Sequence, residues 1–402
     1  MTAAMEAPRL FAGQPGRLML VLTYLSPAGG AETQVVDLAR GFDRRGWDVH
    51  LVSMLTPAPP LPDLTGTRIR VTSLEMRRGV ASPAALARFV TLVRRERPDV
   101  VHSHMTHANL LVRAARPLVR VPVVVNTLHG HKMYSVRSQG SALREIAHRF
   151  TDFLADATTA VSQAAAERYA RVKAVSAQRL VMIPNGIPER AYERDGHARL
   201  RLRASLDARE DFLWLAVGRL EKVKDYATML RAFAIVQEAE PRQMLAIVGG
   251  GSQRSALEKL AADLGIAPRV HFLGVRHDVT GLLQAADGFV LSSVFEGMPL
   301  VLLEAGASGL PMVATRAGGN AEVFPPEQRG WLVPPRTPPA LAQAMLRVLT
   351  LTEEERGAAG AAARNFVLAR YSMDSVLDRW EELYARLLAQ KGVARVAAEA
   401  VR

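Results

Sequence analysis

Two glutamates stand in an otherwise apolar stretch, FEGMPLVLLEAGASGLPMVA, at residues 295–314. An unpartnered buried carboxylate is costly, so Glu296 and Glu304 are each expected to meet a partner at a site. The stretch predicts a loop holding Glu296 and then a helix, on which Glu304 lies about two turns further along on roughly the same side. Both carboxylates would then accept hydrogen bonds from one extended ligand, and sugar hydroxyl groups suit this best. The competing interpretation, one helix cap and one surface glutamate, fits poorly with such apolar neighbours.

Two cations follow another apolar run, FLWLAVGRL at residues 212–220. Arg219 and Lys224 come directly after this predicted strand, at the edge where α/β sheets bind ligands. A guanidinium fork with an ammonium point charge suits a diphosphate, although two solvated loop cations would give the same pattern. The helix start that follows Glu296 would add N–H groups for the same phosphate. The residues expected to form that helix start are Gly297, Met298, Pro299 and Leu300.

Two further strand ends carry residues of interest. SPAGGAE, at residues 26–32, follows the first apolar run, and its glycines, Gly30 among them, let the backbone approach a phosphate or a polar sugar. A tight strand–helix connection is an equally good interpretation of that motif alone. His129 ends the run VPVVVNTLHG and is followed by a glycine that gives access. VGGGSQ, at residues 248–253, lacks the spacing of a dinucleotide fingerprint, so we predict no NAD site there.

Strands and helices alternate along both halves of the chain, which predicts parallel sheets with right-handed crossovers. The continuous apolar run at residues 17–25 is typical of a strand buried on both faces, and residues 48–55 are expected to form another strand. Residues 192–211 are charged and weakly patterned, so we predict a linker there. Two alternating series separated by a linker indicate two Rossmann-like domains that face one another. Amphipathic helices are expected at residues 340–349 and 372–388.

Composition limits the partners of the chain. Its net charge of +12 favours an anionic partner, although arginine-rich composition alone would also produce it. No zinc-finger or RNP-type motif is present, so we predict no nucleic-acid binding. The chain has no cysteine and no uncharged apolar run long enough to cross a bilayer, and cytoplasmic residence is the simplest prediction.

The motifs, taken in order, resemble those of the retaining GT-B glycosyltransferases of glycosyltransferase family 4 (group 1). They are GGAE, His129, PNG, GRL with the lysine of VKDY, FLG with RHDV, and the Glu-x7-Glu segment FEGMPLVLLE. The resemblance covers the whole chain. It implies an α/β GT-B fold with two Rossmann-like domains facing across a cleft and a last helix that crosses back to the first domain. The implied bounds are 1–192 for the acceptor-side domain, 193–370 for the nucleotide-sugar domain, and 371–402 for the crossover helix and tail.

The resemblance also implies how a donor would be held in the second domain. Arg219 and Lys224 would bind the diphosphate of a nucleotide-sugar, and Glu304 would hold the ribose hydroxyl groups. Glu296 would contact the donor sugar beside the reacting carbon. By the same resemblance Arg219 and Lys224 count, with Glu296, among the catalytic residues.

Other positions would complete the site. The resemblance implies that His129 hydrogen-bonds the donor sugar from the opposite domain and is catalytic. Gly30 would line the phosphate and acceptor side. The backbone from Arg276 to Val279 would meet the base.

The expected chemistry is metal-independent transfer with retention at the anomeric carbon. No Asp-x-Asp motif is present, so Arg219, Lys224 and helix N-termini are expected to neutralise the leaving diphosphate. The nucleotide-sugar is a substrate, and neither a cofactor nor a metal is predicted. Glu296 is expected to position the donor and stabilise positive charge rather than to form a covalent intermediate.

UDP is the preferred nucleotide, and the predicted acceptor is a saccharide or lipid-linked saccharide in cell-surface polysaccharide or glycolipid synthesis. Asp225 stands where many relatives carry glycine, and residues 133–149 match no motif, which leaves the acceptor open. Arginines such as Arg94, Arg95 and Arg149 suggest peripheral docking on an anionic membrane surface at the inner face of the cell membrane, although a solvated helix face would look the same. Two alternatives remain: a nucleotide-sugar epimerase of the same fold, and a non-catalytic nucleotide-sugar or membrane-docking module.

Overall fold

The computed structural model describes residues 16–392 apart from 27–28, 58, 60, 78–81, 131–138, 193–195 and 209. The chain divides into an amino-terminal unit, Met1–Gly186 with Met373–Arg402, and a carboxy-terminal unit, Ile187–Ser372. The sequence places these boundaries after residues 192 and 370. In the structure the first boundary comes earlier, after Gly186, and the second comes later, after Ser372. Ile187 and Ser372 form a parallel bridge with each other, so both belong to the carboxy-terminal unit.

The amino-terminal unit contains a seven-stranded, all-parallel sheet in the order β3-β2-β1-β4-β5-β6-β7. Its strands are β1 (Arg17–Leu22), β2 (Asp48–Leu55), β3 (Arg70–Met76), β4 (Val100–His104), β5 (Val123–Leu128), β6 (Ala157–Ala160) and β7 (Leu180–Met182). Its helices are α1 (Gly30–Arg44), α2 (Pro83–Glu96), α3 (Thr106–Ala115), α4 (Gln139–Thr151), α5 (Gln163–Arg171) and α14 (Met373–Gln390), with 3₁₀ turns η1 (Arg116–Leu118) and η2 (Asp152–Leu154). The strand order reverses between β1 and β4, so this pair is the switch point of a doubly wound sheet.

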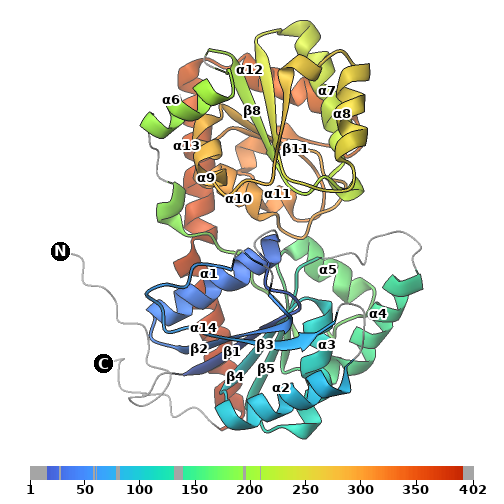
Figure 1. Cartoon of the computed structure of the whole chain (residues 1–402), viewed down its shortest axis with the longest axis vertical. Helices are drawn as coiled ribbons and strands as arrows, with labels where there is room; N and C mark the ends of the chain where they lie inside the picture. Colours follow the sequence, from blue (N-terminus) through green and yellow to red (C-terminus); the bar gives the residue numbers. More distant parts are fainter. Residues whose placement is uncertain are drawn as a thin grey trace, which may run out of the picture. The chain divides into compact units, whose positions relative to one another are not determined.

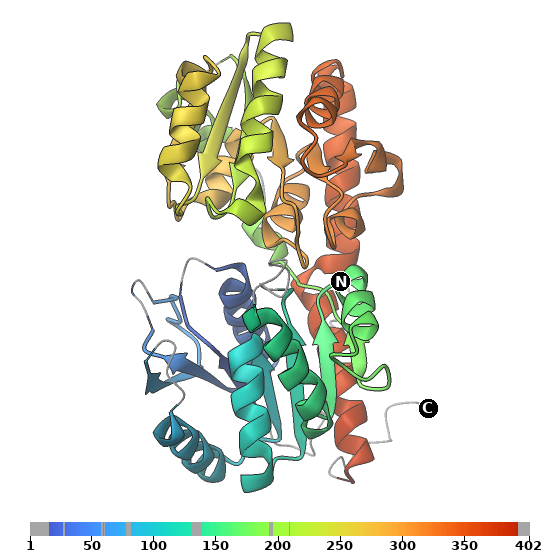
Figure 2. The ribbon, with the colours of Figure 1, turned by 90° about the vertical axis from the view of Figure 1, so that its right-hand side faces the viewer.

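Helices cover both faces of this sheet (Figure 1). On β1, Leu18 and Leu20 pack with residues of α1 and α14, whereas Met19 and Val21 pack with residues of α2 and α3. Successive strand residues point to opposite faces, and both faces are buried, which explains the continuous apolar runs. Figure 2 shows α14 as the long red helix of this unit. Ser82 caps α2, because its hydroxyl accepts a hydrogen bond from the Ala85 N–H at 3.2 Å.

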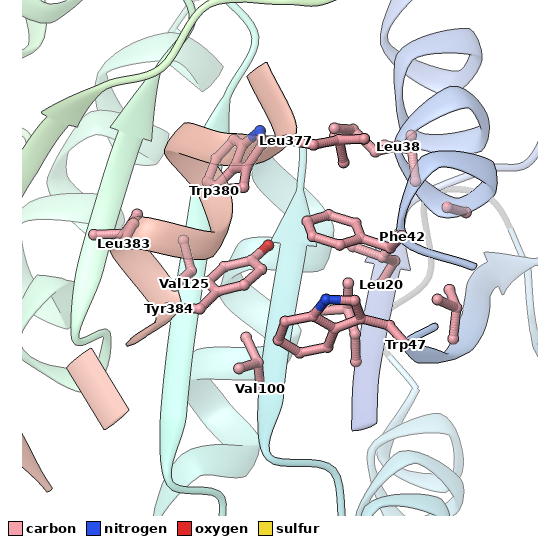
Figure 3. Close-up of a cluster of buried hydrophobic side chains, with 14 of the residues drawn as sticks. Leu20, Leu38, Phe42, Trp47, Val100, Val125, Leu377, Trp380, Leu383 and Tyr384 are labelled. Atoms are coloured by element: carbon pink, nitrogen blue, oxygen red, sulfur yellow. The ribbon is translucent and has the colours of Figure 1, made fainter. Parts of the chain in front are cut away.

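The face under α1 and α14 holds an aromatic cluster (Figure 3). Phe42, Trp47 and Tyr384 contact one another, and the ring centroids of Trp47 and Tyr384 lie 5.5 and 5.8 Å from that of Phe42. The Trp47 indole N–H donates to the Glu381 carboxylate of α14 at 2.8 Å, and Arg45 donates to the same carboxylate at 2.7 Å. The last helix is therefore part of the amino-terminal core, as the crossing back predicts.

The carboxy-terminal unit contains a six-stranded parallel sheet in the order β10-β9-β8-β11-β12-β13. Its strands are β8 (Phe212–Val217), β9 (Gln243–Val248), β10 (Val270–Gly274), β11 (Gly288–Leu291), β12 (Met312–Thr315) and β13 (Leu332–Val333). Its helices are α6 (Gly196–Ser205), α7 (Tyr226–Ala239), α8 (Arg254–Asp263), α9 (Val279–Ala285), α10 (Leu300–Ala307), α11 (Asn320–Val323), α12 (Pro338–Leu349) and α13 (Glu353–Tyr371), with 3₁₀ turns η3 (Glu189–Tyr192), η4 (Lys222–Lys224), η5 (Ala267–Arg269) and η6 (Pro326–Trp331). Here the switch point lies between β8 and β11. Both units are thus Rossmann-like, as predicted.

One prediction about an element is wrong. Half of the expected linker at residues 192–211 is a helix, α6, which packs against α9. Its arginines hold it there: Arg199 and Arg203 both donate to the Asp287 carboxylate, at 2.5 and 2.7 Å. Because ion pairs rather than an apolar stripe fix this helix, its sequence lacks a helical hydrophobic pattern.

Within the described residues, none of the helices combines the length and hydrophobicity needed to span a bilayer.

Candidate active site

The predicted donor-binding residues other than Gly30 belong to the carboxy-terminal unit, and several follow the strands at the switch point of its sheet. Arg219 follows β8, and Glu296 lies in the loop after β11, the neighbouring strand. Both strands are parallel, so their carboxyl ends meet at one edge of the sheet, where open α/β sheets bind ligands. Arg219 is exposed and, in the part of the chain that the structure describes, makes no ion pair.

Lys224 and Glu296 form an ion pair. The Lys224 Nζ donates to Glu296 Oε1 at 2.6 Å, and the two side chains are only 16% and 12% exposed. Ser293 donates its hydroxyl to the same Oε1 at 2.6 Å. A carboxylate oxygen with two donors in a half-buried site is held in one orientation, since charge-assisted hydrogen bonds are short and strong.

The loops that carry this pair are fastened to each other. The Ser292 hydroxyl donates to the Lys224 carbonyl at 2.9 Å, and the Val294 N–H donates to the Val223 carbonyl at 2.9 Å. From the next strand, Thr315 donates its hydroxyl to the Ser293 carbonyl at 2.5 Å. The cation and the carboxylate are therefore placed by backbone contacts as well as by their own attraction.

Tyr226 stabilises the loop after β8 that carries Arg219. Its hydroxyl donates to the Gly218 carbonyl at 3.0 Å and is almost wholly buried. Burial, and then the charge of Glu296, raise the pKa of this phenol above its ordinary value. The hydroxyl consequently stays neutral and keeps donating to the backbone beside Arg219.

Three glycines explain why the loops approach so closely. A Cβ on Gly249 would lie 2.0 Å from the Gly218 carbonyl oxygen, and one on Gly251 would lie 2.4 Å from that of Leu220. A Cβ on Gly318 would lie 1.8 Å from the Glu296 carbonyl oxygen. Since real Cβ atoms do not approach so closely, only glycine fits here. VGGGSQ thus packs the Arg219 loop against β9, which is a structural role.

The helix after Glu296 begins later than its first expected residue. α10 begins at Leu300 with Pro299 as its N-cap, so Gly297 and Met298 belong to the loop. Glu296 lies in the loop, as predicted, and Glu304 lies in the second turn of α10. The loop between the two carboxylates is fastened by its Gly297 carbonyl, which accepts from the Gly319 N–H at 3.1 Å. The start of α10 still follows directly from that loop.

The residues expected near the base lie on the loop after β10. Arg276 is exposed, and its guanidinium donates to both oxygens of Asp278, at 2.8 and 2.5 Å. This pairing raises the pKa of Arg276 further above its ordinary value. Val279 begins α9. The arginine side chain is thus engaged by a neighbour on its own loop.

In the amino-terminal unit, Gly30 and His129 also follow central strands. Gly30 is the first residue of α1, is exposed, and follows the loop after β1. His129 comes directly after β5 and is half-buried. Its Nε2 lies 3.0 Å from the Nδ1 of His104, the last residue of β4. Because β4 belongs to the switch pair of this sheet, the two histidines lie at the edge where a ligand is expected.

A second buried histidine extends this group. His102 contacts the Tyr384 hydroxyl and the Thr127 hydroxyl, both at 2.7 Å, and its ring lies 4.0 Å from that of His104. Burial, followed by the charges of neighbouring histidines, holds the pKa of both His102 and His104 well below the ordinary histidine value. Both rings are neutral at neutral pH.

Sequence reasoning missed several of these partners. Ser293 and Gly318 both contact Glu296. Ser293 could have been found in the sequence, because it belongs to a serine pair at a strand end, three residues before the glutamate. His102 and His104 alternate at the end of a strand, in VVHSH, which places them on one face. Nothing in the sequence signals Gly318, since its role depends on a contact with a distant carbonyl.

Taken together, the carboxy-terminal switch point offers an exposed guanidinium, a lysine fixed by a carboxylate, and a helix start. These features suit a ligand that combines a diphosphate with hydroxyl groups. Among the described residues no cluster of three or more histidine, aspartate or glutamate side chains is arranged to hold a metal ion.

Solved structures with this fold define the class. The Anabaena protein HepE, crystallised in complex with UDP, matches with a TM-score of 0.79 at 22% identity, over 92% of this chain and 100% of that chain. Two Rossmann-like units with a returning last helix are the GT-B fold, and the chain is an α/β protein of that fold class.

Family models then define the family. The model described as "Glycosyl transferase 4-like domain" matches residues 29–186, and the one described as "Glycosyl transferases group 1" matches residues 199–366. The chain belongs to the group 1 glycosyltransferases with a family 4-like first domain, as its motifs predicted.

Comparison with curated relatives agrees with this family assignment. The chain is 27% identical over 308 residues to the UDP-Gal:alpha-D-GlcNAc-diphosphoundecaprenol alpha-1,3-galactosyltransferase of Escherichia coli, covering 75% of this chain and 78% of the relative. It is also 27% identical over 380 residues to the N-acetyl-alpha-D-glucosaminyl L-malate synthase of Bacillus anthracis, covering 92% of this chain and 98% of the relative.

Proposed function

We propose that this glycosyltransferase moves a sugar from a nucleotide-diphosphate-sugar, with UDP as the nucleotide, to a saccharide or lipid-linked saccharide with retention and without a metal. The observation that carries the proposal is the Lys224–Glu296 pair, with its 2.6 Å separation, at the switch point of the carboxy-terminal sheet. HepE crystallises with UDP, and the Escherichia coli relative is named for a UDP-linked donor, which supports the choice of nucleotide.

The donor would be held by separate groups along its length. Arg219 is exposed and follows β8 on the same connection to α7 as Lys224, so these two cations together would offset the charge of the diphosphate. The N–H groups of Gly297, Met298 and Leu300 add donors and a partial positive charge at the start of α10, and Pro299, which has no N–H, shapes the turn between them. Glu304 accepts hydrogen bonds from the ribose, and the backbone from Arg276 to Val279 contacts the base.

The reaction breaks the bond between the anomeric carbon and the diphosphate oxygen and forms a bond from that carbon to the acceptor oxygen. The acceptor proton passes to the departing diphosphate, on the same face, so configuration is retained. Glu296 is held by Lys224 and Ser293, which suits a fixed negative charge beside a developing oxocarbenium ion better than a nucleophile. His129 hydrogen-bonds the transferred sugar.

The acceptor belongs to cell-surface polysaccharide or glycolipid synthesis at the cytoplasmic face of a membrane. The Escherichia coli relative is named for a diphosphoundecaprenol-linked acceptor, and that of Bacillus anthracis for malate, so the family alone does not select a lipid carrier. The basic net charge of +12 favours an acceptor or a surface that is anionic.

The test is transfer by purified variants. Glu296→Ala and Lys224→Ala are each expected to lower kcat/KM at least about 100-fold, because each removes a charge aimed at the transition state, while the folded state persists. Lys222→Ala, an exposed lysine in the same 3₁₀ turn, is the matched control and should keep full activity. Full activity in either test variant would refute the assignment.

Donor, stereochemistry and alternatives are settled with the same protein. A thermal-shift screen of nucleotide sugars identifies the donor, since a ligand of the native state raises Tm. NMR of the product reports the anomeric configuration, and chelator in the assay should leave the rate unchanged. An epimerised nucleotide sugar formed without acceptor would identify an epimerase. Donor binding without turnover on any acceptor pool would identify a non-catalytic module.

A further inference from the structure

An apolar ridge lies on the surface of the amino-terminal unit, outside the candidate active site. Ile146, Phe150 and Phe153 are 50%, 70% and 67% exposed. They follow one another at spacings of four and three residues along α4 and η2, which places them on one side of the helix. Isolated exposed apolar residues are ordinary, but two exposed phenylalanines on one helical face indicate a surface that meets an apolar phase. Figure 1 shows α4 at the edge of this unit.

Cations surround this ridge. A surface hollow of about 470 Å³ next to Phe153 is lined by Arg149, Lys173 and Arg179. Arg149 and Lys173 are exposed, and neither forms an ion pair within the described residues. Arg179 lies 3.5 Å from Asp152, a partner it shares with Arg113.

The carboxylates of this region are already neutralised. Glu145 pairs with Arg168 at 2.6 Å. Asp152 is buried, faces two arginines, and accepts the Ser176 N–H at 3.0 Å. The hollow therefore presents an excess of positive charge directly beside exposed aromatic rings.

We propose that the α4–η2 edge is a docking surface for a bilayer of anionic phospholipids. Ile146, Phe150 and Phe153 enter the boundary between headgroups and acyl chains, while Arg149 and Lys173 bind lipid phosphates. Aromatic and aliphatic side chains with flanking cations are the composition of interfacial helices, and each cation near an anionic surface adds to the attraction. This inference specifies the membrane association in the proposed function but does not depend on glycosyl transfer.

The absence of cysteine from the sequence makes a direct test simple. Phe150→Cys, labelled with an environment-sensitive fluorophore, should show a blue shift on vesicles of phosphatidylcholine with phosphatidylglycerol. Pure phosphatidylcholine vesicles should give a much smaller shift, and high salt should reverse the shift because surface electrostatics are screened. Leu200→Cys, at a site 69% exposed on α6 of the other unit, is the matched control and should show no shift.

Sedimentation of unlabelled variants separates the contributions. Phe150→Ser with Phe153→Ser, and Arg149→Gln with Lys173→Gln, should each weaken partitioning to anionic vesicles at least ten-fold. Leu200→Ser and Arg329→Gln should not change it. Equal binding to neutral and anionic vesicles, or unchanged binding of the double phenylalanine variant, would overturn the proposal. Transfer to a soluble acceptor should be the same in these variants as in the wild type. If the wild-type protein binds anionic vesicles but transfers no sugar, that result counts against the proposed function and not against the docking surface.

A second inference comes from the buried histidine pair. His104 is fully buried, its Nδ1 lies 3.0 Å from His129 Nε2, and its own Nε2 is buried without a hydrogen-bond partner among the described residues. A neutral imidazole has one N–H and one lone pair. Placing the proton on Nε2 would bury an unsatisfied N–H donor, whereas placing it on Nδ1 uses it on His129.

We infer that His104 is a positioning residue that donates from Nδ1 to His129 Nε2. This donation holds the His129 ring in one orientation and keeps the proton of its neutral form on Nδ1. His129 then presents an N–H donor at Nδ1. The role of that donor rests on the proposed function, but the tautomer itself does not.

Long-range ¹H–¹⁵N NMR of the full chain reports the tautomer, with His129→Asn as the assignment control. Protonated Nδ1 and unprotonated Nε2 on His129 are expected, and the opposite pattern would overturn the inference. In transfer assays His104→Leu should lower kcat at least ten-fold with little change in KM. His104→Asn, whose amide can donate from the position of Nδ1, should recover most of the loss. An unchanged kcat in His104→Leu would refute the positioning role. If that variant does not fold, the tautomer measured by NMR on the wild-type protein tests the inference instead.

Discussion

At the scale of single residues, the candidate site depends on glycines as much as on charged groups. Gly318 has a φ of +53°, and its missing Cβ would lie 1.8 Å from the Glu296 carbonyl oxygen. The carbonyl belongs to backbone that also carries the carboxylate held by Lys224. Any side chain at residue 318 must therefore displace the loop that sets the position of Glu296.

Gly318→Ala is accordingly expected to reduce kcat/KM about 100-fold, since a displacement of about 1 Å at a reacting centre has an effect of that size. Gly265→Ala is the matched control: its φ is +72°, but nothing lies within 4 Å of the added methyl group. Both changes strain a left-handed residue by about 1 kcal/mol. Gly318→Ala also has to displace the Glu296 loop, so its Tm should fall further than that of Gly265→Ala. Steady-state kinetics with thermal unfolding distinguishes the two effects. Equal activity of the two alanine variants would show that the contact at Gly318 is unimportant.

The charged residues of the site were easier to predict than their arrangement. Glu296 stands out because its neighbours are apolar, and Arg219 and Lys224 stand out because they follow a buried strand. Their meeting could be inferred only from strand order, since parallel strands end at one edge. The ion pair joins loops 72 residues apart, and the glycine that permits the loop position contacts a carbonyl in another loop, which no local pattern records.

At the scale of elements, strands were predicted well because burial on both faces leaves long apolar runs. α6 was missed for the opposite reason. Its residues GHARLRLRAS carry no apolar stripe, and its place is fixed by arginines that reach across to α9. Arg199 donates to the carbonyls of Gln284, Ala285 and Ala286 at the end of that helix, between 2.8 and 2.9 Å. Cations at a helix C-terminus are favourable, but the sequence does not show which helix end they will meet.

Asp287 is the residue on which this arrangement depends. It accepts hydrogen bonds from Arg199, from Arg203 and from the Leu213 N–H, and Arg203 is buried. Asp287→Ala would leave a buried guanidinium without its counter-charge, so we expect a loss of about 3 kcal/mol in the free energy of unfolding of the carboxy-terminal unit. Urea unfolding measures it.

The control for Asp287→Ala is Asp263→Ala, which removes an exposed partner of Lys259 on α8. That pair is solvent-screened, and its loss should change stability by less than about 0.5 kcal/mol. If the two alanine variants unfold at the same urea concentration, the arginine–aspartate network does not hold α6 in place.

At the scale of the whole molecule, the chain returns to its first unit after completing its second. Val376, Leu377, Trp380 and Tyr384 of α14 are buried against α1 and the strands of the amino-terminal sheet. The amphipathic pattern of residues 372–388 predicted a helix, but only the family resemblance indicated which unit it joins. An apolar stripe shows that one side of a helix is buried, but it does not show which element buries that side.

The two units also differ in how they should respond to acid. The amino-terminal unit buries His102, His104 and His148, and burial lowers the pKa of each, with that of His148 falling to about 3. For His148 the nearby Arg113 guanidinium lowers the pKa further. Each histidine binds a proton less readily in the folded unit than in the unfolded chain, where the pKa is about 6.5.

Between these two pKa values the unfolded chain takes up more protons, so stability is complete above about pH 6.5 and decreases as pH falls below it. At pH 5.5, one unit below the unfolded value, His148 is expected to cost about 1.4 kcal/mol, and His102 and His104 act in the same direction. Hydrogen exchange, corrected for intrinsic rates, should therefore show the amino-terminal unit opening more readily at pH 5.5 than at pH 7. His148→Gln should make this change smaller, whereas His277→Gln, at an exposed position of the carboxy-terminal unit, should not. Equal loss of protection in both units would mean that other groups control the acid response.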